Sequence, residues 1–128
     1  MKKILLTLTL VFAVSSSAFA ASSETESNNT FETANTLNVD SSILGEVDRT
    51  DKEDNFVFVA NKTGQVRVLL TGPTGLAAVG LYNSDTEYIK NSAIDIPLDF
   101  DVVAGQKYYL KVVGFNQTTS YNLSVSNL

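Results

Sequence analysis

Apolar and polar residues alternate with a period of two along most of the chain that follows residue 40. In the stretch 96–102, every second residue is apolar: Ile96, Leu98, Phe100 and Val102. Such alternation is typical of strands that bury one face. We predict about eight strands, in or near the ranges 43–47, 55–60, 65–71, 77–83, 87–91, 96–102, 108–112 and 121–125, with 87–91 at an edge.

The segments between these strands carry turn residues. Asn, Gly, Pro and Ser gather at 61–64, 72–75, 83–85, 104–105 and 116–117. One short helical turn is expected near 31–35, and there is no helical crossover that could join parallel strands. The pattern predicts an all-β fold, an antiparallel β-sandwich with jelly-roll or Greek-key connections.

The first twenty residues have the features of a secretory signal. Lys2 and Lys3 precede an apolar core at 4–14, and Ala18-Phe19-Ala20 forms a small-x-small cleavage site. The apolar core is shorter than the roughly 20 residues that span a bilayer, so we expect no membrane association. The predicted organisation is a signal peptide at 1–20, a polar N-terminal arm at 21–36 and a β-sandwich domain at 37–128.

Composition removes several kinds of chemistry. The chain has no cysteine and no histidine, which excludes thiol catalysis and the Ser-His-Asp triad and makes a transition-metal site improbable. Loss of Lys2 and Lys3 with the signal leaves 7 basic and 14 acidic residues, a net charge of −7. A chain this acidic is not expected to bind nucleic acid.

Oxygen ligands remain, and two segments are rich in them. The arm supplies Glu24, Glu26, Asn28 and Asn29, and the loop 46–54 supplies further acids. In an extended arm, residues 24, 26 and 28 face the same way, so they could present oxygens to a Ca²⁺ ion together. The loop is not an EF-hand. From spacing alone, a solvated acidic turn is the simpler interpretation.

Two tyrosines are candidates for ligand recognition. Tyr109 has the opposite parity to the inward row that begins at Tyr108, so with Lys107 and Lys111 it is expected on an outer sheet face, and Tyr82 is likewise opposite to Leu81. Exposed tyrosine on a flat sheet is a common recognition device. A tyrosine packed beneath a loop is the alternative interpretation.

Several motifs occur in a recognisable order. They are the arm Glu24-x-Glu26-x-Asn28-Asn29, then Ala34-Asn35, Gly45, Asp54-Asn55-Phe56-x-Phe58, Gly64, Leu81-Tyr82-Asn83, Ala104-Gly105-x-x-Tyr108-Tyr109-Leu110-x-Val112 and Tyr121-x-Leu123-x-Val125. In this order and spacing the chain resembles the bacterial pre-peptidase C-terminal domain, which is related to the collagen-binding domains of clostridial collagenases. The resemblance runs from Glu24 to Val125.

The resemblance implies a jelly-roll-like β-sandwich outside the cell and, as in the collagenase branch, a calcium site that fastens the arm to the sheet. The ligands it implies are Glu24, Glu26, Asn28, Asn29, Asp51 and Asp54, with Glu46 as a weaker candidate. Two positions depart from the common pattern: Ser27 stands where many members have proline, and Lys52 stands where many have an acid.

The resulting hypothesis is a secreted, calcium-stabilised, non-catalytic module that binds an extracellular polymer or protein through Tyr82, Tyr109 and Lys111. One alternative is a secreted regulatory or structural protein, such as a protease inhibitor or matrix component. A small carboxylate-dependent hydrolase is the other, although a domain of this size has little room for a deep cleft.

Overall fold

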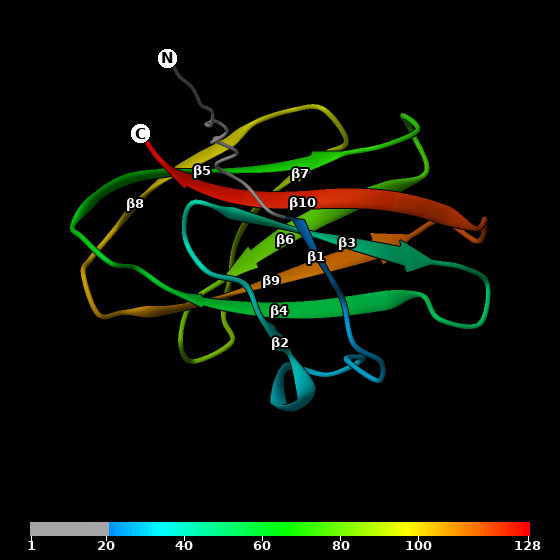
Figure 1. The fold of residues 1–128 in the computed structure, drawn as a ribbon, viewed down its shortest axis with the longest axis horizontal. Coiled ribbons are helices and arrows are strands. Elements are labelled where there is room, and N and C mark those ends of the chain that lie inside the picture. Colours follow the sequence, from blue (N-terminus) through cyan, green and yellow to red (C-terminus); the bar gives the residue numbers. More distant parts are fainter. Residues whose placement is uncertain (1–20) are drawn as a thin grey trace, which may run out of the picture.

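The computed structural model describes residues 21–128, so the predicted signal peptide at 1–20 lies outside the described residues. The described chain forms ten strands and one short 3-10 helix, η2 (Phe31–Thr33) (Figure 1). The strands are β1 (Ala21–Ser23), β2 (Asn35–Thr36), β3 (Ser41–Val47), β4 (Glu53–Val59), β5 (Gly64–Thr71), β6 (Ala77–Tyr82), β7 (Tyr88–Ala93), β8 (Leu98–Val102), β9 (Lys107–Gly114) and β10 (Thr119–Asn127).

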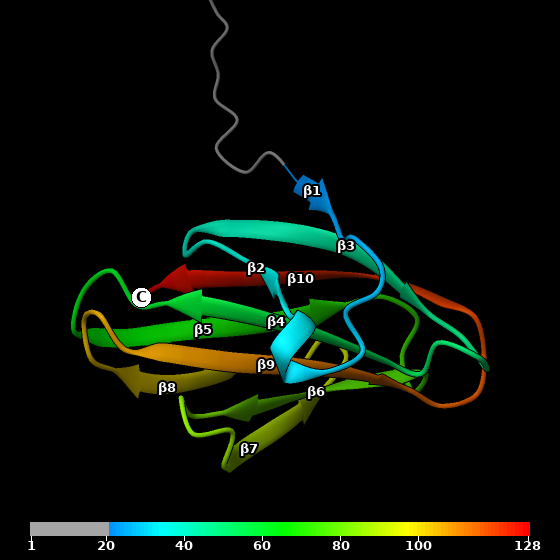
Figure 2. The ribbon, with the colours of Figure 1, turned by 90° about the horizontal axis from the view of Figure 1, so that it is seen from below.

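The strands form two five-stranded sheets that pack face to face. The first sheet has the order β1-β3-β10-β5-β8 and the second has the order β2-β4-β9-β6-β7. Consecutive strands alternate between the sheets except for the β6–β7 hairpin, so the neighbours within a sheet are mostly distant in sequence. This arrangement confirms the predicted β-sandwich (Figure 2). Within residues 21–128, no helix has the length and apolar character needed to cross a membrane.

The inward rows of the strands form the core. Phe56 and Phe58 of β4 are fully buried, and Phe58 stacks on Tyr108 of β9 with ring centroids 5.4 Å apart. Tyr108 also meets Phe100 of β8 edge to face at 5.6 Å. The predicted inward parity of β9 is therefore confirmed, and the predicted edge strand near 87–91 is β7, the last strand of its sheet.

Three details differ from the sequence-based expectation. Ile96 was expected to point inward, but its side chain is 56% exposed, and Ile94 occupies the core instead. The cause is a turn, because the Ile96 amide donates to the Ala93 carbonyl and Asp95 has a positive φ of 68°. The strand β8 therefore begins only at Leu98.

The other two differences lie in the arm. It forms two strands that the sequence did not predict, and both of them pair in the parallel direction. β1 pairs with β3 and β2 pairs with β4, and both pairs are parallel, whereas all strands had been expected to pair antiparallel. The arm segments are polar and lack alternation, so their own sequence does not mark them as strands. They are extended because they pair with the sheet edges that β3 and β4 would otherwise expose.

Candidate metal centre and aromatic face

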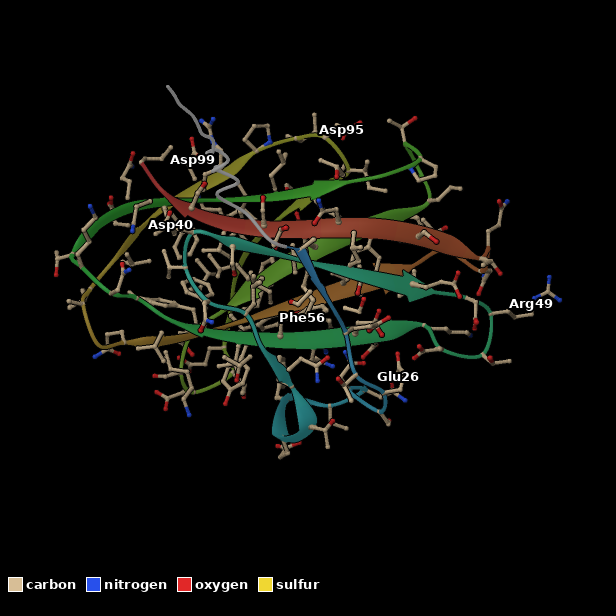
Figure 3. The ribbon with its side chains drawn as sticks, viewed as in Figure 1. Glu26, Asp40, Arg49, Phe56, Asp95 and Asp99 are labelled. Carbon is tan, nitrogen blue, oxygen red and sulfur yellow. The ribbon has the colours of Figure 1, made fainter. Side chains whose placement is uncertain are left out.

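Three carboxylates converge where the arm passes over the start of β4. Oxygens of Glu24, Glu26 and Asp54 lie within 4.8 Å of one another. Glu24 is placed by its backbone amide, which donates to the Leu44 carbonyl at the end of β1. Asp54 is the second residue of β4 and is buried. Figure 3 shows Glu26 on the arm beside β4, on the side of the molecule away from Asp40 and Asp99.

Asn28 connects these acids to the sheet. Its side-chain nitrogen donates to Glu24 Oε1 at 3.0 Å and to Asn35 Oδ1 at 3.1 Å. Its backbone carbonyl accepts from both the backbone amide and the side-chain nitrogen of Asn55, at 2.8 and 3.0 Å. Asn28 is fully buried, yet its Oδ1 atom has no hydrogen-bond partner, and the same holds for Oδ1 of Asp54. Two buried acceptors therefore lack a donor within this group, which is uncommon in proteins.

The loop between β3 and β4 lies beside the cluster. With its amide nitrogen turned toward them, Asn29 donates to Asp51 Oδ1 at 2.8 Å and to the Glu53 carbonyl at 3.0 Å. Asp48 stabilises the loop itself, because its Oδ1 accepts from the amides of Thr50 and Asp51. These backbone hydrogen bonds lower the pKa of the Asp48 carboxyl below its usual range. Asp48 therefore shapes the loop, and Asp51 faces the arm.

A buried tyrosine holds Asp54 in place. The hydroxyl of Tyr121, in the inward row of β10, donates to Asp54 Oδ2 at 2.6 Å. The ring reaches this position because Gly45 lies beneath it, and a Cβ atom on Gly45 would stand 2.3 Å from the Tyr121 hydroxyl oxygen. Sequence reasoning placed Tyr121 in the core but missed this role. The signal available was a phenolic hydroxyl in a buried row, which needs a partner.

The carboxyl groups raise one another's pKa. Partial loss of hydration, a hydrogen bond with Asp51 and the negative charge of Glu24 raise the pKa of Glu26 to about 7. Burial and the charge of Glu24 raise the pKa of Asp54 to about 8, although the Tyr121 hydroxyl acts in the opposite direction. Burial also raises the pKa of Tyr121, so its hydroxyl remains a donor. A positive charge at this point would reverse the unfavourable interactions among the acids.

The group fits a hard divalent cation. It consists of oxygen donors, and among residues 21–128 none of Glu24, Glu26 and Asp54 forms an ion pair with lysine or arginine. The two unpartnered buried oxygens described above add acceptors that a cation would satisfy. Calcium is bound in proteins by six to eight oxygen ligands, mainly from carboxylates, amides and backbone carbonyls, so donors of this kind suit it.

A second candidate site lies on the outer face of the second sheet. The ring of Phe31, from η2, meets Tyr82 of β6 and Tyr109 of β9 edge to face, with centroids 5.0 and 5.2 Å apart. The ammonium of Lys111 lies 4.6 Å from the Phe31 centroid and 5.4 Å from that of Tyr82, and it pairs with Glu53 at 3.6 Å. Figure 2 shows η2 lying against the face formed by β4 and β9.

Two grooves flank this aromatic cluster. The larger, about 410 Å³, is lined by Phe31, Glu32, Val57, Val59, Lys107 and Tyr109 among others. The smaller, about 240 Å³, is lined by Tyr82, Tyr88, Lys111 and Phe115 among others. The ring of Phe31 thus touches a tyrosine from each groove.

Comparison with solved structures places the fold. The pre-peptidase C-terminal domain of a collagenase from Bacillus anthracis superposes with a TM-score of 0.63 at 23% identity, over 72% of this chain and 93% of that one. The chain has the fold of a pre-peptidase C-terminal domain. A mitogen from Yersinia pseudotuberculosis matches with a TM-score of 0.55 and 17% identity, over 68% of this chain and 84% of that one. No family model and no curated protein sequence matches the chain.

Within this pre-peptidase C-terminal fold, the predicted ligand residues are distributed unevenly. Glu24, Glu26 and Asp54 meet directly, while Asn28 touches Glu24 and Asn29 touches Asp51. The Glu46 carboxylate is not part of the Glu24–Glu26–Asp54 cluster, and it accepts from the Ser120 hydroxyl on the outer face of the first sheet. Only its backbone amide reaches the group, donating to Glu24 Oε2 at 2.7 Å. The predicted ligand-binding residues Tyr82, Tyr109 and Lys111 all meet Phe31 on one outer face.

Proposed function

We propose that the protein is a secreted, non-catalytic β-sandwich module that binds an extracellular polymer or protein and is stabilised by calcium. The observation that carries the binding proposal is the groove of about 410 Å³ on the outer face of the second sheet. It combines tyrosine, phenylalanine and valine with a lysine at its margin. Binding surfaces of proteins are enriched in such aromatic groups with nearby polar contacts.

The fold agrees with this proposal, because the similar structure from Bacillus anthracis is the pre-peptidase C-terminal domain of a collagenase. The predicted signal sequence supports secretion. A groove of mixed polar and apolar lining on a rigid sheet is also a favourable place for recognition, since the sheet holds its side chains with little loss of entropy on binding.

Calcium enters the proposal through the Glu24–Glu26–Asp54 group. When bound, calcium would supply positive charge that offsets the repulsion among these carboxylates. It would also give a partner to the two buried acceptors that lack one, Asn28 Oδ1 and Asp54 Oδ1. Glu24 and Glu26 belong to the arm, and Asp54 belongs to β4. Binding at all three would therefore fix the arm to the sandwich and raise the stability of the folded state.

A cosedimentation assay tests the binding face. The purified chain is incubated in calcium with insoluble extracellular polymers, including fibrous proteins, chitin and peptidoglycan, and the bound fraction is measured. Tyr109→Ala and Val59→Ser should each weaken binding about tenfold, the range expected when a central contact is truncated. The matched control is Leu44→Ser, because Leu44 is 46% exposed and Val59 is 53% exposed, but Leu44 lies on the other sheet.

The control should bind as the unchanged protein does. Unaltered binding by Tyr109→Ala and Val59→Ser, with melting temperatures that show folded protein, would remove this face from the proposal. Binding by secreted proteases instead of polymers would favour a regulatory protein, which a parallel pull-down with such proteases detects.

A further inference from the structure

Phe31 itself meets the sheet through its ring, and the segment around it is anchored at Asn28, which bonds to Asn55, and at β2, which pairs with β4. None of the three residues of η2 is buried, and the hydrogen bonds of the turn join Thr30 to Thr33 within the turn itself. The ring, in contrast, lies between Tyr82 and Tyr109 with the Lys111 ammonium 4.6 Å from its centroid. Two tyrosine rings and a cation form a receptor for one aromatic ring, and the chain's own turn fills it.

The position of this ring divides the outer face. Phe31 and Tyr109 line the larger groove, and Tyr82 and Lys111 line the smaller one. Because Phe31 contacts both tyrosines, its departure would join the two grooves into one continuous surface across β9. A ligand that follows the sheet face must therefore either stop at Phe31 or replace it.

The charges near the receptor indicate which ligand could replace it. Glu32 follows Phe31 and lines the larger groove together with Lys107, whose ammonium lies 6.0 Å from the centroid of the Tyr109 ring. The segment that fills the receptor thus presents an aromatic residue followed by an acid to a surface with two lysines. Opposite charge at this point would align a peptide of the same pattern in the same direction.

We propose that the pocket formed by Tyr82, Tyr109 and Lys111 is a receptor for an aromatic residue of a partner peptide, with an adjoining acid, and that Phe31 occupies it as an internal competitor. The proposal rests on the function proposed above and specifies its partner as a peptide segment. A tethered ring has a high effective concentration, so a partner binds only to the fraction of molecules in which Phe31 has left the pocket. If that fraction is about one tenth, the apparent Kd is raised about tenfold.

The test adds a free peptide whose phenylalanine ring can compete with Phe31 for the pocket. The probe is the acetylated, amidated peptide Thr-Phe-Glu-Thr, which has the sequence of residues 30–33, and the control peptide has alanine in place of phenylalanine. Both are titrated into the folded chain while the backbone amide resonances of Tyr82, Tyr109 and Lys111 are followed by NMR. The proteins are the unchanged chain, Phe31→Ala, and Phe31→Leu, which keeps an apolar side chain if the alanine variant does not fold.

A matched control truncates a different aromatic side chain, Phe115, which lines the smaller groove. Phe115→Ala opens the smaller groove but leaves the contacts of Phe31 with both tyrosines intact. The phenylalanine peptide should bind Phe31→Ala or Phe31→Leu about tenfold or more tightly than it binds the unchanged chain or Phe115→Ala. The alanine peptide should bind none of them measurably.

Equal binding to the unchanged chain and the Phe31 variants would overturn the proposal, as would equal binding of the two peptides. So would a lack of response at Tyr82, Tyr109 and Lys111 in folded Phe31→Leu. These outcomes are distinct from failure of the proposed function. Polymer binding that depends on Tyr109 can persist when the peptide does not bind, and the peptide can bind when no polymer does.

Discussion

Gly45→Ala should destabilise the fold strongly, because the added methyl group has no space. The new Cβ atom would lie 2.3 Å from the hydroxyl oxygen of Tyr121 and 2.4 Å from its Cζ atom. The ring is buried and its hydroxyl is bonded to Asp54, so it cannot move without breaking that bond. Overpacking of a core costs about 1–3 kcal/mol, and leaving a buried acceptor without its donor costs about 1–3 kcal/mol more.

A total of about 2–4 kcal/mol allows for partial relaxation and corresponds to a fall in Tm of roughly 8–16 °C for a domain of this size. Thermal and urea unfolding followed by circular dichroism measure it. Gly80→Ala is the matched control, since Gly80 is also in a strand and the nearest atoms, 3.2 Å away, belong to the half-exposed ring of Tyr82. Its free energy of unfolding should change by less than about 1 kcal/mol.

A double-mutant cycle examines the cause. Tyr121→Leu removes the atoms that meet the new Cβ, so Gly45→Ala should cost much less in that background than alone. Strictly additive effects, or a Gly45→Ala variant within about 0.5 kcal/mol of the unchanged chain, would refute the account of the Gly45–Tyr121–Asp54 contact.

The remaining predictions concern charge. Calcium at 1 mM should raise Tm by roughly 2–10 °C, as expected for a site with a Kd of about 0.1–1 mM, and Glu26→Gln should abolish the rise; an equal rise with magnesium would exclude a calcium-selective site. Because the folded-state pKa values of Glu26 (about 7) and Asp54 (about 8) lie above those of the unfolded chain, the stability measured in EDTA should fall as pH rises from about 5 to 8.5. A calcium ion needs the deprotonated groups, so its stabilising effect should instead grow over the same range, and a constant effect would contradict the assigned ligands. Arg67→Met should cost less than about 1 kcal/mol despite two hydrogen bonds to Asp99 at 2.7 and 2.8 Å, since both side chains are exposed; a loss above 2 kcal/mol in urea unfolding would contradict this.

Much of the sandwich follows from local sequence. The alternation of Phe56 and Phe58, and of Tyr121 and Leu123, specifies which side of each strand is buried, and the structure has the same parity. Ile96 shows where that reasoning fails. The alternation of apolar and polar residues begins at Ile96, but the backbone turns at Asp95 and the strand begins only at Leu98. Alternation alone does not reveal such a turn.

The candidate sites were predictable to different degrees. Spacing predicted that Glu24 and Glu26 face the same way in an extended arm, and the family resemblance added Asp54; the structure brings these three carboxylates together. The path of that arm across both sheets could not be predicted, since β1 and β2 are determined by pairing with distant strands. The position of Phe31 over Tyr82 and Tyr109 has the same origin. A phenylalanine in a polar segment indicates burial somewhere, but it does not indicate which face will cover it.

The strand order gives the sandwich two unlike sides. On one side the sheets end in the arm strands β1 and β2, which are only three and two residues long and therefore offer little edge for pairing. On the other side β7 and β8 are the last strands, and a hydrogen bond from the Lys90 ammonium to the Asp99 carbonyl, 2.8 Å long, connects them. Growth of an intermolecular sheet requires an uncovered edge. Self-association of folded molecules should therefore be one-sided and stop at pairs, joined through β7 or β8, whereas loss of the arm would open the second side and allow chains of molecules to extend.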